Sequence, residues 1–514
     1  MSLVLVRSRR RIIANYRPLV VAESLVLYGE TVVAVGNYED MKNALAGSDY
    51  TELESEYVLA PGFVDAHAHP DSLGYNLVLG GKMETSSVKD VLEKLGESRV
   101  VAGWVVPPRI DPSSLREGRM PYYWEIDAYV RDKPVLIQHI SGHMASLNSV
   151  GIALAREVLG QIRFGDLEKG WLYEEDLWRL LTHIRSSMRE PELEEALLLG
   201  LREFESKGVT AVGAAGLSFR EVEALKRLDK EGKLPIRVYG YVIYTGGPDF
   251  DYDYVEKLLY ETWGDRSSRF RINGLKVILD GALGPRTAYL SSDYSDEPGR
   301  RGFLNYNEEE LEKVFAEASR RNLQVAVHVI GDAALEVALR VARRVRDLYL
   351  RLEHVSLVRD DQLGYIKELG PVLVVQPHFV ISDKWMTQRV GCDRIRWVYR
   401  FKELADVAVT AYSTDAPVEP VDPFETVYAA VTRGLYDDVD YARASLRNAV
   451  TVAEALAHYT VDAGLALGDP RLGCLLPGCY ADIVELSDDP LLQYDPVKVR
   501  GLKASVVKLI KGSK

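Results

Sequence analysis

The strongest chemical signal in the sequence is a pair of histidines, His67 and His69, in the string APGFVDAHAHP at residues 60–70. The string begins as an apolar run of strand length, and residues two apart in a strand point to the same face. Both imidazoles can therefore converge on one ion, as histidine ligands of metals do. A His-x-His pair often arises by chance, so a metal site also needs ligands from elsewhere in the chain.

Three further candidate ligands, His328, His354 and Asp415, end or follow other strand-like runs, QVAVH, RLEH and VAVTAYSTD. Barrel enzymes carry their chemistry at the C-terminal ends of their strands. Any one of these residues could be a hydrogen-bonded core histidine or a turn-capping aspartate. Together, four coinciding strand ends indicate a metal centre, in which Asp415 can also take a proton from metal-activated water.

Lys276 is the remaining candidate, because it lies inside the apolar run GLKVILDG at residues 274–281. Burial disfavours the ammonium form by up to several pKa units, so a lysine there needs a reason. A nearby Asp or Glu would be the structural explanation. The functional explanation is that the neutral amine reacts with carbon dioxide, and that the carbamate bridges two metal ions.

Apolar runs of strand length alternate with amphipathic helical segments through most of the chain, which predicts an α/β fold with parallel strands. Eight such runs predict a (β/α)8 barrel, and their near-continuous apolar character fits strands covered on both faces. An open doubly wound sheet is the alternative, but no Gly-x-Gly-x-x-Gly turn supports its dinucleotide-binding version. The expected strands are residues 58–66, 209–214, 236–242, 275–279, 324–328, 351–355, 372–376 and 407–412.

The barrel pattern leaves three parts of the chain to be explained. Residues 71–207 are too many for a simple βα connection, which predicts a folded insertion subdomain. Short β-rich runs near both termini indicate one shared β domain. The predicted division is a composite β domain at 1–59 and 470–514, the barrel at 60–70 and 208–469, and the insertion at 71–207.

Composition restricts the partners. The net charge of −13 over 514 residues disfavours nucleic acid, and the run Arg9-Arg10-Arg11 is interpreted as solvated surface. No apolar run approaches the roughly 20 residues of a membrane span, and the first 20 residues lack the core of a signal peptide. We therefore expect a cytoplasmic protein with a small-molecule substrate. The few cysteines suit a reducing compartment, and Cys474 and Cys479 are interpreted as small buried hydrophobic residues, although they could pair.

The candidate ligands follow a familiar order. The series His-x-His, Lys, His, His, Asp on strands one, four, five, six and eight resembles the amidohydrolase superfamily. Its YtcJ-like branch, also called amidohydrolase family 3, is similar in longer strings and over nearly the whole chain, including the long insertion. These strings are LDGALGPRT at 279–287, HVIGD at 328–332, QPHF at 376–379, DAPV at 415–418 and LPGCYADI at 476–483.

The resemblance implies a barrel with a β-sandwich built from both termini and a divalent metal centre, usually zinc. It implies hydrolysis of non-peptide carbon–nitrogen bonds, N-substituted formamides among them, with Asp415 as general acid and base. One metal would bind His67, His69, carboxylated Lys276 and Asp415, and the second would bind the carbamate, His328 and His354. The implied substrate contacts are His143, Arg286, Gln376 and His378.

Two alternatives stay open. A mononuclear site on His67, His69, His328 and Asp415 leaves Lys276 structural and also suits a deaminase. A non-catalytic, metal-binding regulatory relative on the same scaffold is the second alternative, and a lost ligand would mark it, whereas all six candidate ligands are present. The sequence leaves substrate, natural metal and oligomeric state open, although enzymes of this size commonly form homo-oligomers.

Overall fold

The computed structural model describes residues 3–80, 83–139, 144–247 and 250–507. The chain divides into two compact units. One unit comprises Met1–Pro70 and Leu201–Lys514, and the other comprises Asp71–Gly200. Each unit is considered separately below.

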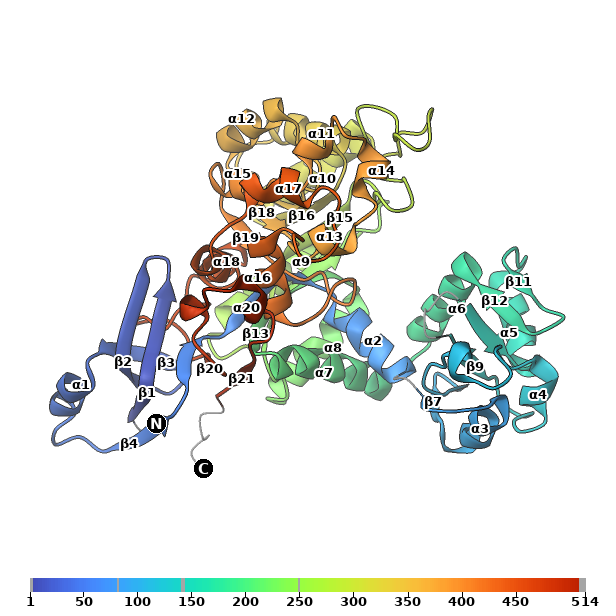
Figure 1. The fold of residues 1–514 in the computed structure, drawn as a ribbon, viewed down its shortest axis with the longest axis horizontal. Helices are drawn as coiled ribbons and strands as arrows, with labels where there is room; N and C mark the ends of the chain where they lie inside the picture. The colour runs from blue at the N-terminus through green and yellow to red at the C-terminus, as the bar shows by residue number, and fades with distance from the viewer. Residues whose placement is uncertain (1–2, 81–82, 140–143, 248–249, 508–514) are drawn as a thin grey trace. The chain divides into compact units, whose positions relative to one another are not determined.

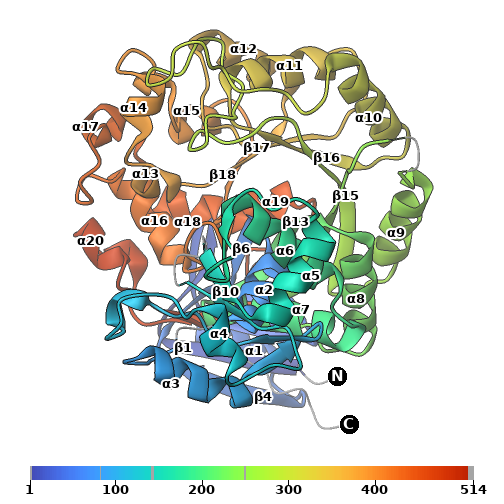
Figure 2. The ribbon, with the colours of Figure 1, turned by 90° about the vertical axis from the view of Figure 1, so that its right-hand side faces the viewer.

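Eight parallel strands in the first unit form a nearly closed barrel, which confirms the predicted fold class. Backbone hydrogen bonds from Asp415 N to His67 O (2.9 Å) and from His69 N to Ala416 O (2.8 Å) join its first and last segments. Figure 2 shows the strands as a ring with helices outside. In barrel order the strands are β6 (Phe63–Ala68), β13 (Val209–Leu217), β14 (Arg237–Ile243), β15 (Phe270–Ile278), β16 (Gln324–Val329), β17 (Leu350–His354), β18 (Val372–Val375) and β19 (Thr410–Tyr412).

The inside of the barrel is a packed core, and a helix covers its N-terminal end. Inward-facing strand residues such as Val374 form one cluster with Ala463 of α19 (Val461–Ala466). Near the start of β15, the Asn273 side chain donates to Leu467 O at 2.9 Å, just after this helix. The opposite, C-terminal end is therefore the end at which a barrel carries its chemistry.

Helices surround the barrel, and local sequence sets where they begin. In α10 the capping box is reciprocal: Glu310 N donates to the Asn307 side chain, and Asn307 N donates to the Glu310 carboxylate. Residues three and four apart then give each helix an apolar face toward the strands. No helix in the described part of the chain is long and apolar enough to cross a membrane. The helices of this unit are α1 (Tyr38–Ala44), α8 (Phe219–Lys230), α9 (Tyr252–Gly264), α10 (Glu308–Arg320), α11 (Asp332–Ala342), α12 (Asp360–Leu369), α13 (Phe379–Ser382), α14 (Met386–Val390), α15 (Phe401–Ala405), α16 (Pro423–Thr432), α17 (Ala442–Ser445), α18 (Val452–His458), α19 and α20 (Pro496–Val499).

Strands from both ends of the chain join in a second sheet of seven strands (Figure 1). Two of its strands form a hairpin around residues 28–31, with the left-handed Gly29 (φ 62°) in its turn. Apolar residues from both ends, such as Leu25 and Ile483, share one core cluster. The strands are β1 (Leu3–Tyr16), β2 (Leu19–Tyr28), β3 (Thr31–Gly36), β4 (Tyr50–Ser55), β5 (Val58–Pro61), β20 (Ile483–Leu486) and β21 (Ala504–Val506).

The longest strand, β1, contains the arginine cluster that the sequence indicated only as solvated surface. Arg9 pairs with Glu54 of β4 at 2.7 Å, and Arg10 pairs with Asp488 at 2.7 Å. Carboxylates from distant parts of the chain thus make a charged run compatible with a strand.

The interpretation of Cys474 and Cys479 as two unpaired hydrophobic residues is wrong, because they form a disulfide. Their Cα atoms lie 5.9 Å apart, within the range that a disulfide can span. The turn at Gly478 (φ 94°) folds the six-residue segment 474–479 back on itself. Cys474 and Cys479 are therefore close in space as well as in sequence.

The second unit has its own hydrophobic core, built around residues such as Val91, Ile126 and Ile137. Its four-stranded sheet has the order β11-β12-β10-β9, and β7 and β8 form a separate antiparallel pair. Its elements are α2 (Pro70–Leu79), α3 (Val88–Glu93), β7 (Arg99–Val101), β8 (Trp104–Val106), α4 (Tyr123–Asp127), β9 (Leu136–Gln138), β10 (Met144–Leu147), α5 (Ser149–Leu159), β11 (Gly165–Asp166), β12 (Trp171–Tyr173), α6 (Glu174–Ser186) and α7 (Glu190–Ser206), the last of which runs into the first unit.

Candidate metal centre

His67 of β6 and His69, which directly follows this strand, both point their Nε2 atoms at Asp415, which follows the last strand. The distances to Asp415 Oδ1 are 3.3 Å from His67 and 3.1 Å from His69. Asp415 Oδ1 is buried and makes no hydrogen bond. Burial alone would raise the pKa of Asp415, but His67 and His69 outweigh it and hold that pKa well below its usual range.

His354 completes a group of three candidate ligands with His67 and Asp415. One ligand atom from each lies within 4.8 Å of the others, and all three side chains are buried. His354 Nδ1 contacts Gln376 Oε1 at 2.8 Å, while Gln376 Nε2 donates to Ser413 Oγ at 2.9 Å. Because the amide oxygen must then be the acceptor, Nδ1 carries the proton and Nε2 keeps its lone pair for a ligand.

His354 and Asp415 both have a left-handed backbone, with φ of 70° and 60°. Such conformations cost roughly 1–3 kcal/mol for residues other than glycine and persist where the surroundings enforce them. Hydrogen bonds do so here: Val355 N donates to Val329 O, and Asp415 N donates to His67 O, each at 2.9 Å. Two of the three converging side chains therefore leave strained turns.

Lys276 lies beside this group, with its Nζ 3.5 Å from His67 Nε2. Burial lowers its pKa to about 8, although Glu353 and Asp415 oppose the shift. A larger fraction of the amine is therefore neutral near neutral pH than in an exposed lysine, and the neutral amine is the form that can react with carbon dioxide.

His328 is close to the group but is oriented differently. Its ring lies 4.4 Å from that of His354, while its Nε2 is 3.1 Å from the carbonyl oxygen of Gly281. Burial, and then the Lys276 charge, lowers the pKa of His328 to about 4. His328 and His69 do not belong to the three-residue group that His354 completes.

A buried ion pair supports His67, and sequence reasoning missed it. Glu353 Oε2 accepts the His67 Nδ1 hydrogen bond at 2.5 Å, and Arg351 Nε donates to Glu353 Oε1 at 2.5 Å. A carboxylate that accepts from Nδ1 leaves Nε2 as the ligand atom, a common arrangement behind metal-binding histidines. The available signal was two charged residues in the otherwise apolar run of β17, all fully buried.

Arg351 in turn ties the pair to the rest of the barrel. Its Nη2 donates to Ala66 O at 2.6 Å, and its Nη1 donates to Tyr241 Oη at 2.8 Å. Burial alone would raise the pKa of Glu353, but Arg351 and His67 hold it well below its usual range. Glu353 therefore stays ionised and keeps accepting the His67 proton.

These donors fit a divalent metal ion. Imidazole nitrogens and a carboxylate are the ligand types that zinc takes, and a catalytic site needs three such protein ligands and an open position. The buried, unbonded Asp415 Oδ1 and the Nε2 atoms directed at it provide this set.

The expected substrate contacts have mixed surroundings. Gln376 touches His354 at the centre. Arg286 pairs with Asp296 at 2.9 Å, and His378 Nδ1 contacts Glu419. His143 lies outside the described residues.

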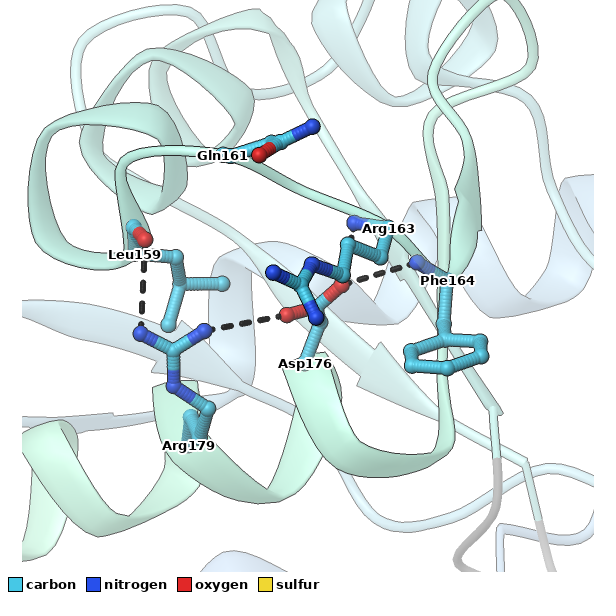
Figure 3. A pocket seen from close by; sticks show the side chains of 6 residues that line it. All are labelled: Leu159, Gln161, Arg163, Phe164, Asp176 and Arg179. Carbon is cyan, nitrogen blue, oxygen red and sulfur yellow. Dashed lines mark hydrogen bonds and ion pairs between the residues drawn. The ribbon is translucent and has the colours of Figure 1, made fainter.

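A separate cavity of ≈ 190 Å³ lies in the second unit beside α5 and α6 (Figure 3). Its buried carboxylate, Asp176, accepts the backbone N–H groups of Arg163 (2.6 Å) and Phe164 (2.8 Å) and a bond from Arg179 (3.3 Å). These bonds occupy both carboxylate oxygens, so Asp176 ties a loop to α6 and is not a free base.

Sequence comparison places the chain among known proteins. Residues 56–512 match the model of the amidohydrolase family. The chain belongs to the amidohydrolase family. This amidohydrolase is 25% identical over 505 residues to the YtcJ amidohydrolase of Bacillus subtilis (strain 168), covering 94% of this chain and 93% of YtcJ. It is 24% identical over 509 residues to the N-substituted formamide deformylase of Arthrobacter pascens, with 91% of each chain covered.

Solved structures agree with this placement. A metal-dependent hydrolase from Pyrococcus horikoshii OT3 matches with a TM-score of 0.80 and 32% identity, covering 96% of this amidohydrolase and 98% of that chain. One from Pyrococcus furiosus matches with a TM-score of 0.80 and 30% identity, covering 95% and 100%. The resemblance predicted from the sequence is confirmed, and the chain is a hydrolase of this metal-dependent family.

Proposed function

We propose that this hydrolase cleaves amide-type carbon–nitrogen bonds other than peptide bonds in a small molecule, with a divalent metal held at the barrel mouth. The observation that carries the proposal is the convergence of His67, His354 and Asp415 within 4.8 Å. The bond type is supported by two relatives, which are named as an amidohydrolase and as an N-substituted formamide deformylase.

The residues present would hold the metal as follows. His67, His69 and Asp415 form one set of donors, since both Nε2 atoms approach the same carboxylate oxygen. His354 and His328, whose rings lie 4.4 Å apart, form a second set. Lys276 lies next to His67, so a carbamate on its Nζ would serve both sets. This carbamate forms when the neutral amine attacks carbon dioxide and releases a proton.

A divalent cation there would supply Lewis acidity, which polarises a carbonyl group and makes water acidic near neutral pH. Asp415 would take the proton from the attacking water on the carboxylate oxygen that does not bind the metal, and pass it to the leaving nitrogen. Its low pKa keeps Asp415 ionised, so the carboxylate carries no proton before the water attacks. Glu353 and Gln376 would hold the histidine rings in the tautomers that leave Nε2 free.

A mononuclear site is a second candidate, and one observation favours it. The His328 Nε2 atom contacts Gly281 O rather than the shared centre. A single ion would then lie on His67, His354 and Asp415, with Lys276 as a structural neighbour.

Lys276→Ala separates the two candidates. A bridging carbamate predicts that the metal content of the freshly purified variant falls from about two ions per chain to about one or fewer. It also predicts partial recovery of activity with short carboxylic acids, which replace the missing anion. One ion per chain in both the variant and the wild type, measured by elemental analysis, would establish the mononuclear site, and two ions in both would contradict a bridging carbamate.

The reaction class is tested by screening the zinc-loaded protein against N-substituted formamides, other amides, cyclic ureas and deaminase substrates. Hydrolysis of an amide-type bond, abolished by a chelator and restored by zinc, is the expected result. Turnover confined to deamination would replace the proposal, and a metal-loaded protein that turns over no member would point to the non-catalytic alternative.

A further inference from the structure

The mouth of the barrel has an apolar side, formed where β13, β14 and β15 end. Ile278 is 41% exposed although it closes an otherwise buried strand. Side chains two apart in a strand share a face, so Ile278 points the same way as Lys276. Ile278 also pairs in register with His328, and Lys276 pairs with Ala326 of the barrel core. Ile278 therefore lies on the inner wall, one layer above Lys276.

The neighbouring strands extend this wall. Ile243 is the register partner of Lys276, so it faces inward beside the lysine stem. A register shift in β13 falls between Ala215 and Leu217, which leaves Gly216 as the extra residue of a bulge. A Cβ atom on Gly216 would meet Ile243 Cδ1 at 3.8 Å and Lys276 Cγ at 3.9 Å. Gly216 thus leaves a small recess between the Ile243 side chain and the methylene stem of Lys276.

The candidate metal ligands lie on other strands of the barrel than this wall, which gives the site a polar side and an apolar side. His67, His354 and Asp415 bring ligand atoms together at the ends of the strands numbered one, six and eight around the barrel. The wall made by Gly216, Ile243 and Ile278 lies on strands two, three and four, joined to the centre by Lys276. A substrate held at the centre can therefore place a substituent against this wall.

We propose that Gly216, Ile243 and Ile278 form the specificity wall of the site, and that the substrate is an amide carrying an alkyl or aryl substituent rather than a charged one. This inference rests on the proposed function, since it assumes that the scissile bond lies at the metal centre. A charged substituent would lose its water against two isoleucines without gaining a partner. An apolar substituent gains instead, and each buried methylene is worth about four-fold in binding or in kcat/KM.

The experiment uses two homologous series with the zinc-loaded protein. N-alkylformamides from methyl to hexyl report turnover, and linear alkyl hydroxamic acids of the same lengths, which chelate zinc, report binding by calorimetry. For the wild type, kcat/KM and affinity both rise about four-fold per added methylene until the wall is covered. Ile278→Ser flattens both slopes to about two-fold or less, whereas Ile278→Leu keeps them.

Leu465→Ser is the matched control. Leu465 is 42% exposed, close to the 41% of Ile278, but it lies on α19 at the other end of the barrel. This variant keeps both slopes. If both slopes flatten equally in Leu465→Ser and Ile278→Ser, the proposed wall is overturned, because the loss would then not depend on the position of the changed residue.

The two series separate the two proposals. A hydroxamate slope that depends on Ile278, without formamide turnover, supports the wall and goes against amide hydrolysis. Formamide turnover with a flat wild-type slope supports the proposed function and overturns the wall. Hydroxamates that fail to bind the zinc-loaded protein would overturn both proposals.

Discussion

Two buried histidine–glutamate pairs lie near the C-terminal end of the barrel and have opposite surroundings. In each, the histidine Nδ1 contacts a glutamate Oε2: His67 with Glu353, and His378 with Glu419. The His67 Nε2 atom faces the unbonded Asp415 oxygen at 3.3 Å. The His378 Nε2 atom faces a second glutamate, at 3.8 Å.

The support behind the two glutamates also differs. Arg351, fully buried, pairs with Glu353, whereas the hydroxyl of Ser382 donates to Glu419 at 2.5 Å. A buried carboxylate with an arginine stays charged and rigid, which suits a group that orients a metal ligand. The His378 Nε2 atom makes no hydrogen bond, and among the described residues His378 belongs to no group of three candidate metal ligands. We therefore expect the first pair to serve the centre and the second to tie the start of α13 to the segment that precedes α16.

The largest expected effect on activity comes from changing Asp415, the residue that His67 of the first pair faces. Asp415→Asn keeps the shape of the side chain but removes the base, so activity should fall by about 10²–10⁴-fold. Circular dichroism and metal analysis should show an intact fold and most of the metal. Activity within ten-fold of the wild type would remove Asp415 as the base.

Removing the arginine behind the first pair should cost stability. Arg351→Met leaves Glu353 buried without its counter-charge, at a cost of about 3–5 kcal/mol in the free energy of unfolding. Arg500→Met is the control, because Arg500 is 41% exposed in its pair with Glu425 and should contribute about 1 kcal/mol or less. Urea unfolding measures both. Equal losses of unfolding free energy in the two variants would mean that burial of the first pair adds nothing to stability.

Matched glutamate changes test the difference in role directly. Glu353→Gln should weaken zinc binding by about 10–100-fold, because the His67 tautomer and basicity are no longer held. Glu419→Gln should leave zinc affinity within about two-fold. Competition with a chromophoric chelator gives both dissociation constants. If both variants lose affinity equally, His378 also belongs to the metal centre.

The smallest effect is expected for Ser382, which donates a hydrogen bond to Glu419 of the second pair. Ser382→Ala removes one hydrogen bond to Glu419 and should cost about 1 kcal/mol of stability. Its kcat/KM should stay within about two-fold of the wild type. A loss of ten-fold or more would show that the His378 pair acts on the substrate.

The sequence by itself determined the repeating pattern of the barrel and the positions of its candidate ligands. Apolar runs of strand length are local features, and His67, His328, His354 and Asp415 can be placed at strand ends without knowing which strands are neighbours. The hairpin around Gly29 was predictable for the same reason. These features depend on residues close together in the chain.

Only the tertiary structure decided what those residues face. The Arg351 contact to Ala66 O spans 285 positions, and the His67 contact to Glu353 spans 286, so no local pattern predicts them. The strand through Arg9 depends on carboxylates that come from elsewhere in the chain. The wall at Ile278 likewise exists only because β13, β14 and β15 lie side by side. Pairing between distant segments sets the charges, tautomers and apolar surface around the candidate metal centre.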